Sequence, residues 1–390
     1  MTGPSPATRR LTRLPGWLAA ALLALGGARA EGQRAPALRL PPANASLAEE
    51  FSHVIAVREL RDGRVLVSDY RDNRVVVADF ATGAVQSIAR SGSGPQEFRR
   101  ADRLFAITGD STILSDPGNG RWLMLDGDGV VTTVPPDAPA VEHLRTPIGA
   151  DSLGRMLGVG GAVNVHQMLA GRGVDSFVVL LVHRGAARTD TIARLRPPEA
   201  VRPSMVRSAE TRVARGSCSI PWWAAGEQAV LFRDGWVAVA RLSPYRVEWR
   251  SPDGRTIRGA PLPFAPTPID EREKRAFMER TARRTGRPAQ PPATIAEWPD
   301  EMPPFSSISA VLGAPSPALH TAPDGRLLIL RMPTADAPDT RYDVIDRSGR
   351  LVGELILSFN EAIAGFGTGS VYVVSIDSDG IQRLRRHPWP

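Results

Sequence analysis

The sequence predicts an all-β fold, and three observations lead to that prediction. The 390 residues include 36 glycines and 35 prolines, a content typical of many turns and few long helices. Short runs of Val, Ile and Leu are bounded by Asp, Gly and other turn residues, as in β-strands. A pattern of this kind also recurs along the chain at an interval of about 45 residues. Together these features exclude an all-α bundle.

The first two copies of the repeat carry the same charged residues 47 positions apart: Asp69, Arg74 and Asp79 in one copy, and Asp116, Arg121 and Asp126 in the other. Each copy consists of four strands separated by an Asp/Gly turn, a polar loop and a Gly turn. Four antiparallel strands with a period of about 45 residues are typical of one blade of a β-propeller. Because an active site is needed only once, the repetition favours a structural role, as turn acceptors and ion pairs that fix each blade.

Weaker copies have their first turns near residues 153, 234, 324 and 369. The intervals from 153 to 234 and from 234 to 324 are about twice the others, which leaves room for seven or eight blades. The extra sequence in them has no four-strand pattern, however. The sequence therefore predicts a six-bladed β-propeller with two loop/helix insertions on one face, at residues 196–226 and 261–307.

Both insertions are expected between the fourth strand of one blade and the first strand of the next. Connections of this kind leave the same face of a propeller, so we expect the insertions to form a partial lid over that mouth of the channel. The second insertion contains a predicted helix with Thr267 as its N-cap, Pro268 at its first position and Gly286 after its end.

The amino terminus resembles an export signal. Arg9, Arg10 and Arg13 precede an apolar run at residues 17–26, and Ala-Arg-Ala at 28–30 forms a cleavage site. We therefore expect residues 1–30 to be a signal peptide and residues 31–390 to form a secreted or periplasmic propeller. The apolar run is shorter than the roughly 20 residues that span a bilayer, so no stable membrane insertion is expected after cleavage. An uncleaved membrane anchor is the alternative.

The predicted ring needs a strand from the amino terminus to close it. The sixth predicted blade has only three strands before Pro390, which would leave a sheet edge unpaired. We expect residues 37–40 (Ala-Leu-Arg-Leu) to supply its fourth strand and close the ring.

Charge and cysteine content exclude several classes. Four of the 48 basic residues lie in residues 1–30, and the remaining 44 face 41 acidic residues. A nucleic-acid partner requires a concentrated basic stripe; the sequence has none, so no nucleic acid is predicted. Cys218 is the only cysteine, which rules out an intrachain disulfide.

The segment Arg90-Ser-Gly-Ser-Gly-Pro-Gln-Glu-Phe98, followed by a strand, a turn and an Asp-x-x-x-Asn-type loop, resembles the NHL repeat. The chain is similar to secreted bacterial six-bladed β-propeller proteins with NHL-like repeats, most specifically over residues 51–134. The resemblance implies a binding platform. Some proteins of this type are lyases or lactonases, so a metal-assisted hydrolase or lyase is the alternative that the resemblance implies.

The candidate ligand-binding residues lie on the predicted insertion-bearing face. Arginines can bind an anionic group through forked donors, and aromatic side chains often line recognition sites. The alternatives are solvated surface for the arginines and packing of the insertions for the tryptophans. The candidates are Arg71, Arg74, Arg99, Arg100, Arg121, Trp222, Trp223 and Trp298.

No metal or other cofactor is predicted. His53, His143 and His320 fall in or near first strands, where NHL-like lyases hold a metal, but they lie at different distances from the following turn. At about 3.3 Å per strand residue the mismatch is roughly 15 Å, too large for one metal ion. A calcium site at Asp69, Asp72 and Asp116 is a further alternative, although no loop has a dense acidic pattern.

These observations predict a secreted or periplasmic binding propeller that recognises a small molecule, a glycan or a protein on the insertion-bearing face. The metal-assisted hydrolase or lyase, and a purely structural envelope component, remain alternatives. The sequence identifies no catalytic residue.

Overall fold

The computed structural model describes residues 35–135, 144, 147–160, 176–184, 188–196, 202–207, 214–219, 225–285, 298–305 and 318–390, together with Met1 and Gly3. Ala35–Pro390 forms one compact unit. Apart from Met1 and Gly3, the expected signal peptide lies outside the described residues.

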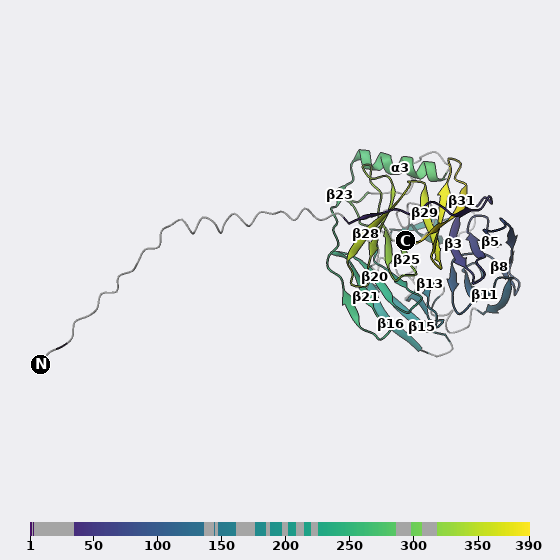
Figure 1. Cartoon of the computed structure of the whole chain (residues 1–390), viewed down its shortest axis with the longest axis horizontal. Helices are drawn as coiled ribbons and strands as arrows, with labels where there is room; N and C mark the ends of the chain where they lie inside the picture. Colours follow the sequence, from purple (N-terminus) through teal and green to yellow (C-terminus); the bar gives the residue numbers. More distant parts are fainter. Residues whose placement is uncertain are drawn as a thin grey trace. The chain divides into compact units, whose positions relative to one another are not determined.

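Six sheets of the unit form blades, and each contains at least four strands, which follow one another along the chain or are completed from its amino-terminal part (Figure 1). Three further sheets have two strands each. Blade one comprises β3 (Val54–Glu59), β4 (Val65–Asp69), β5 (Arg74–Ala78) and β6 (Val85–Ser87). Blade two comprises β9 (Leu104–Ala106), β10 (Thr112–Asp116), β11 (Arg121–Leu125) and β12 (Val130–Val134). Blade three comprises β13 (Pro147–Ala150), β14 (Met156–Gly160), β15 (Phe177–His183) and β16 (Arg188–Leu195).

The second half of the chain supplies the other three blades. Blade four comprises β19 (Gln228–Leu231), β20 (Val237–Leu242), β21 (Tyr245–Arg250) and β22 (Thr256–Arg258). Blade five comprises β25 (Leu319–Thr321), β26 (Leu327–Leu330), β27 (Thr340–Ile345) and β28 (Leu351–Leu357). Blade six comprises β29 (Glu361–Gly367), β30 (Ser370–Ile376) and β31 (Gln382–Pro388). A parallel pair, β7 (Arg90–Ser91) and β8 (Glu97–Phe98), connects the first two blades.

The six sheets form a closed ring. The first strands β3, β9, β13, β19 and β25 are neighbours in that order, and β29 lies beside β3. Blade six is also joined to blade five, because the amide of Ile363 donates a hydrogen bond of 3.1 Å to the Tyr342 hydroxyl. The fold is therefore the six-bladed β-propeller that the sequence predicts.

Apolar side chains hold each pair of neighbouring blades together. The strands are nearly continuous runs of Val, Ile and Leu because both faces of each sheet are covered. Between blades six and one, for example, Val67 and Val76 pack with Tyr372 and Leu384. Equivalent clusters lie between the other pairs of neighbours, so burial against both neighbours stabilises every blade.

Close approach of the first strands depends on glycine at two places. A Cβ atom on Gly149 of blade three would lie 2.9 Å from the Leu231 side chain of blade four. One on Gly365 of blade six would lie 2.8 Å from the carbonyl oxygen of Val57 in blade one. Both distances are shorter than a normal van der Waals contact, so only glycine lets the inner strands pack this closely.

The amino-terminal segment closes blade six, but not through the residues that the sequence indicated. The closing strand is β2 (Ala45–Ser46), which pairs antiparallel with β31. The expectation for residues 37–40 was wrong: β1 (Ala37–Leu38) instead pairs in parallel with β28 of blade five. The side chains that follow β2 explain why this segment closes the ring. Leu47 and Phe51 are 2% and 1% exposed and are buried in the cluster between blades six and one.

The repeated aspartates fix the start of the first strand within each of the first two blades. The Asp69 carboxylate accepts the amide hydrogen of His53 at 2.8 Å and lies 3.5 Å from Arg74. Asp116 in blade two accepts the amide hydrogen of Arg100 at 3.0 Å and lies 3.7 Å from its own arginine, Arg121. The structural interpretation of the repeat is therefore confirmed in these two blades.

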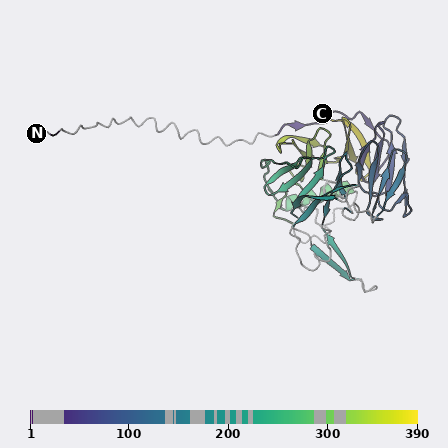
Figure 2. The same ribbon diagram turned by 90° about the horizontal axis from the view of Figure 1, so that it is seen from below.

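The described part of the first insertion is a hairpin. It consists of β17 (Arg202–Arg207) and β18 (Ala214–Ser219), which pair with each other and with no other described strand. Figure 2 shows this hairpin projecting beyond the four-stranded sheets. Much of the expected lid falls on residues outside the described ranges, so the lid stays a prediction.

The second insertion contains helix α3 (Glu271–Thr285). The helix begins later than predicted, because the Asp270 side chain accepts the amide hydrogen of Glu273 at 2.9 Å and serves as the N-cap. The predicted N-cap segment instead forms β23 (Thr267–Pro268), which pairs with β24 (Glu301–Met302). Among the described residues no helix is long and apolar enough to cross a membrane.

Helix α3 is anchored on blade five. The nearly buried Glu273 carboxylate accepts the amide hydrogen of Ala335 through both oxygens, at 3.0 and 2.9 Å. Arg280 donates to the carbonyl oxygens of Pro333 and Thr334. These acceptors lie between the second and third strands of blade five, so the helix sits at the end of the blade where such loops lie.

Candidate functional site

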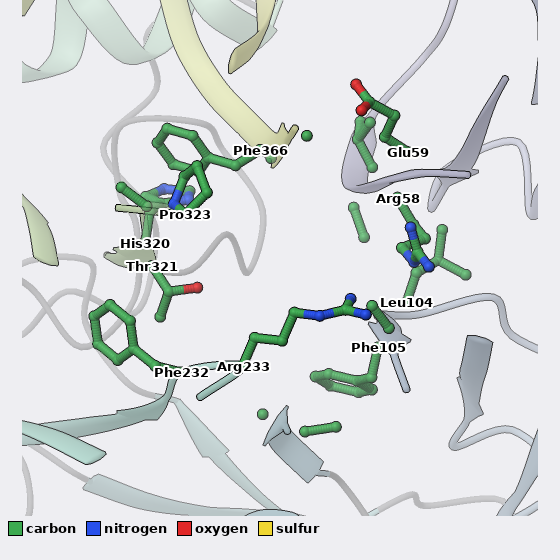
Figure 3. A pocket seen from close by; sticks show the side chains of 18 of the residues that line it. Arg58, Glu59, Leu104, Phe105, Phe232, Arg233, His320, Thr321, Pro323 and Phe366 are labelled. Atoms are coloured by element: carbon green, nitrogen blue, oxygen red, sulfur yellow. The ribbon is translucent and has the colours of Figure 1, made fainter. Parts of the chain in front are cut away.

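A cavity of about 790 Å³ occupies the centre of the ring. All six blades line it with residues of their first strands and of the turns that follow those strands (Figure 3). In an antiparallel blade the turn between strands one and two lies at the opposite end from the loop between strands two and three. The cavity therefore lies toward the end of the channel away from α3.

Arg58 of blade one projects into this cavity (Figure 3). One of its terminal nitrogens donates a hydrogen bond of 2.7 Å to the carbonyl oxygen of Gly109, in the neighbouring turn of blade two. Its Nε is buried and has no hydrogen-bond partner among the described residues. Burial lowers the pKa of this guanidinium, and the positive charge of Arg233 lowers that pKa further.

Arg233 approaches the same space from blade four, on the opposite side of the ring. Its backbone is fixed by blade three, because the Ser152 amide donates a hydrogen bond of 2.9 Å to the Arg233 carbonyl oxygen. The side chain extends across the cavity toward Arg58 (Figure 3). Two like charges thus meet in the channel, an arrangement that folding alone does not favour.

A second pair of basic groups faces each other from blades two and five. Arg103 directly precedes β9, and His320 lies in β25; both line the cavity. Burial lowers the pKa of His320 to about 4, with a further contribution from Arg103. Burial also lowers the pKa of Arg103, whereas Asp102 opposes that change. At neutral pH His320 is uncharged, so Arg103 supplies the positive charge of this pair.

The acidic residues of the lining already have partners within the protein. Glu59 accepts hydrogen bonds from the Tyr372 hydroxyl and, at 2.9 Å, from the amide of Thr368. Asp234 accepts hydrogen bonds of 3.1 and 3.2 Å from Arg347. Arg347 is itself held over the aromatic rings of blade four. These carboxylates therefore do not neutralise Arg58, Arg103 and Arg233 by direct contact.

Apolar side chains form the other part of the cavity wall. Phe105, Phe232 and Phe366 lie around it, and Thr321 of blade five adds a small hydroxyl side chain (Figure 3). Ile55 and Val230 add aliphatic surface. The site can accordingly contact both a charged group and an apolar group of one ligand.

The arginines proposed from the sequence lie elsewhere, and none lines this cavity. Arg74 pairs with Glu49 at 2.6 Å, and Arg121 donates to the carbonyl oxygens of Gly94 and, at 2.7 Å, Glu97. Both thus hold backbone segments in place. The other three are exposed at the ends of blades one and two, where ligand contact stays a prediction: Arg71, Arg99 and Arg100.

Only one of the three candidate tryptophans can be placed. Trp222 and Trp223 lie outside the described residues. Trp298 packs against Phe277 of α3, with ring centroids 5.4 Å apart, in a small cluster that includes Met302 and Met332. Its described contacts thus match the alternative interpretation, in which it packs the second insertion onto the propeller.

The candidate metal ligands do not gather at one place in the described part of the chain, where no group of three or more His, Cys, Asp or Glu side chains is arranged to hold an ion. His53 is buried at the opposite end of its strand from the cavity, beside Tyr70. His143 lies outside the described residues. Asp69 and Asp116 are engaged with backbone amides.

The cavity arginines were missed because the sequence search for channel residues considered only histidines. First strands line the channel of a propeller, so any charged residue in them is a candidate. Arg58 stands four residues before Asp62 in the first turn of blade one, and Arg233 directly precedes the Asp234-Gly235 turn of blade four. Those positions could have identified both residues.

Comparisons with known proteins add little about function. No protein-family model matches the chain, and no curated protein matches it. Among solved structures, a catalytically inactive variant of virginiamycin B lyase from Staphylococcus aureus, solved with quinupristin, is 9% identical, with 90% of this chain and 98% of that chain covered and a TM-score of 0.40.

Two further structures are similar to the same extent. A putative gluconolactonase is 12% identical, with 90% of this chain and 96% of that chain covered and a TM-score of 0.45. A member of the duf4221 family from Bacteroides vulgatus is 7% identical, with 88% and 96% covered and a TM-score of 0.47. At such low identity these similarities concern the fold, and no argument about activity rests on them.

Proposed function

We propose that this protein is an exported binding propeller that holds a small molecule in its central cavity. The observation that carries the proposal is the cavity itself, which combines apolar side chains with converging polar groups, as small-molecule sites do. The cavity lies toward the turns between first and second strands. We therefore place the ligand there rather than on the insertion-bearing face.

A thermal-shift screen tests this function. The purified mature chain is melted with a panel of sugars, amino acids, neutral aromatic compounds and organic anions. A ligand of the folded state raises the melting temperature, because binding shifts the unfolding equilibrium by mass action. We expect at least one class to do so, and we expect the effect to disappear in Thr321→Trp, which fills the cavity from β25.

The matched control is Thr256→Trp, which adds the same side chain at an exposed position of β22, the outer strand of blade four. Stabilisation that survives Thr321→Trp would place the ligand outside the cavity and contradict the proposal. Metal analysis of the same preparation addresses the alternative, since a stoichiometric, tightly bound metal ion would favour the metal-assisted hydrolase or lyase.

A further inference from the structure

We infer that the cavity binds a small organic oxyanion with two negative charges and an apolar group, an inference that rests on the proposed function. The ligand class follows from which groups of the lining are still available. Five arginines line the cavity: Arg347 is engaged with Asp234, and Arg61 follows Arg58 in blade one. Arg58, Arg103 and Arg233 come from three different blades, and the two acidic residues of the lining are engaged elsewhere.

The charge of the site points to an anion. Arg58, Arg103 and Arg233 stay protonated because the guanidinium pKa is far above neutrality. Among the described residues Arg233 forms no ion pair, and Arg58 makes its hydrogen bond to a neutral carbonyl oxygen. Bringing like charges together inside a channel is unfavourable. A bound anion would remove this repulsion, which a neutral or cationic ligand cannot do.

The geometry favours two negative charges on one group. Arg58 and Arg233 reach toward each other from opposite blades, so a tetrahedral or planar oxyanion between them can accept hydrogen bonds from both sides (Figure 3). The buried Nε of Arg58, which lacks a partner among the described residues, is a donor that such a group could satisfy. Phosphate monoesters have this chemistry, because one phosphoryl group carries close to two negative charges at neutral pH.

The apolar side chains of the cavity favour an organic anion over an inorganic ion. Phe105 and Phe366 line the space beside the arginines (Figure 3). A cavity of about 790 Å³ is much larger than one phosphate ion needs. We therefore expect an aromatic or aliphatic group of the ligand to contact these rings.

Titration calorimetry of the mature chain tests the inference with three named probes. Phenyl phosphate carries both features, inorganic phosphate carries only the charge, and phenyl β-glucoside carries only the ring. We expect phenyl phosphate to bind most tightly, inorganic phosphate more weakly and phenyl β-glucoside not measurably. Binding of phenyl phosphate should also weaken as the salt concentration rises.

Substitution of Arg233 tests whether phenyl phosphate binds in the cavity. Arg233→Gln removes a charged donor from an exposed turn and should weaken phenyl phosphate binding by about tenfold or more. Arg255→Gln is the matched control, because it makes the same change in the outer turn of blade four, where Arg255 pairs with the exposed Asp253. The control should bind like the unmodified chain, and neither variant should lower the melting temperature in the absence of probe.

Two results would overturn the inference. Equal affinity of Arg233→Gln and Arg255→Gln for phenyl phosphate would show that the cavity arginines do not bind it. Binding of phenyl β-glucoside, lost in Thr321→Trp, together with no binding of either phosphate, would refute an anion site while leaving the binding function intact. If no compound of the wider screen binds in the cavity, the proposed function itself fails.

Discussion

At the scale of single residues, the interior of the ring keeps two histidines uncharged. His53 and His320 lie at different depths of blades one and five, and burial lowers the pKa of each from 6.5 to about 4. A nearby arginine contributes in both cases, Arg71 for the first and Arg103 for the second. The same burial that shapes the channel therefore makes the fold sensitive to acid.

This sensitivity has a definite sign. Between pH 6.5 and about 4 the unfolded chain binds protons at these histidines and the folded chain does not, so stability falls as the pH falls. At pH 5 each histidine should lower the free energy of unfolding by about 2 kcal/mol relative to pH 7. Above pH 6.5, the pKa of histidine in the unfolded chain, this loss of stability is absent.

Denaturant unfolding of the unmodified chain and of His53→Gln at pH 7 and pH 5 checks this prediction. Glutamine keeps the backbone hydrogen bond to Asp69 but has no titratable group. The loss of stability between the two pH values should be about 2 kcal/mol smaller in the variant. An equal loss in both proteins would show that His53 is not the acid-sensitive group.

At the scale of elements, the amino-terminal segment contains two short strands with different roles. β2 closes the ring, and the residues after it continue the pairing: Leu47 donates to the carbonyl oxygen of Leu384, and Phe51 exchanges backbone hydrogen bonds with Gln382. β1 only adds a strand to the outer edge of blade five. The two strands should therefore contribute unequally to stability.

Matched leucine substitutions compare them. Leu47→Ala removes a side chain that is 2% exposed in the cluster between blades six and one, and should cost about 2–5 kcal/mol. Leu38→Ala removes a partly buried side chain beside blade five and should cost clearly less. The melting temperatures of the two variants provide the measurement. Equal losses, or a greater loss for Leu38→Ala, would contradict the assignment of β2 as the closing strand.

At the scale of the whole molecule, the sequence was sufficient for the fold because the fold is repetitive. Asp69 and Asp116 perform the same task in two blades, so the period of the charged residues reveals the blade. The closing strand was misplaced because nothing in the short segment before blade one distinguishes residues 37–40 from Ala45–Ser46. Only the burial of the residues that follow β2 decides between them.

The cavity depends on long-range contacts and was correspondingly harder to predict. Arg58 and Arg233 are separated by most of three blades in the sequence and meet only when the ring closes. The hydrogen-bonding partners that engage Glu59 and Asp234 also come from distant parts of the chain. The sequence of a single repeat therefore cannot show that Arg58 and Arg233 lack an acidic partner within the protein.

The proposed export also concerns the whole chain. The basic residues, the apolar run and the small residues at 28–30 predict cleavage after Ala30. Amino-terminal sequencing of the mature protein should therefore begin at Glu31. Protein that stays in the membrane fraction and still begins at Met1 would instead support an uncleaved anchor.

The central claim is that the channel, and not the insertion-bearing rim, is the binding site. A crystal structure of the mature chain with phenyl phosphate tests this claim most directly. We predict the phosphate between the guanidinium groups of Arg58 and Arg233, with the phenyl ring against the phenylalanines of the cavity. A phosphate bound at Arg71, Arg99 or Arg100 with an empty channel would contradict the account.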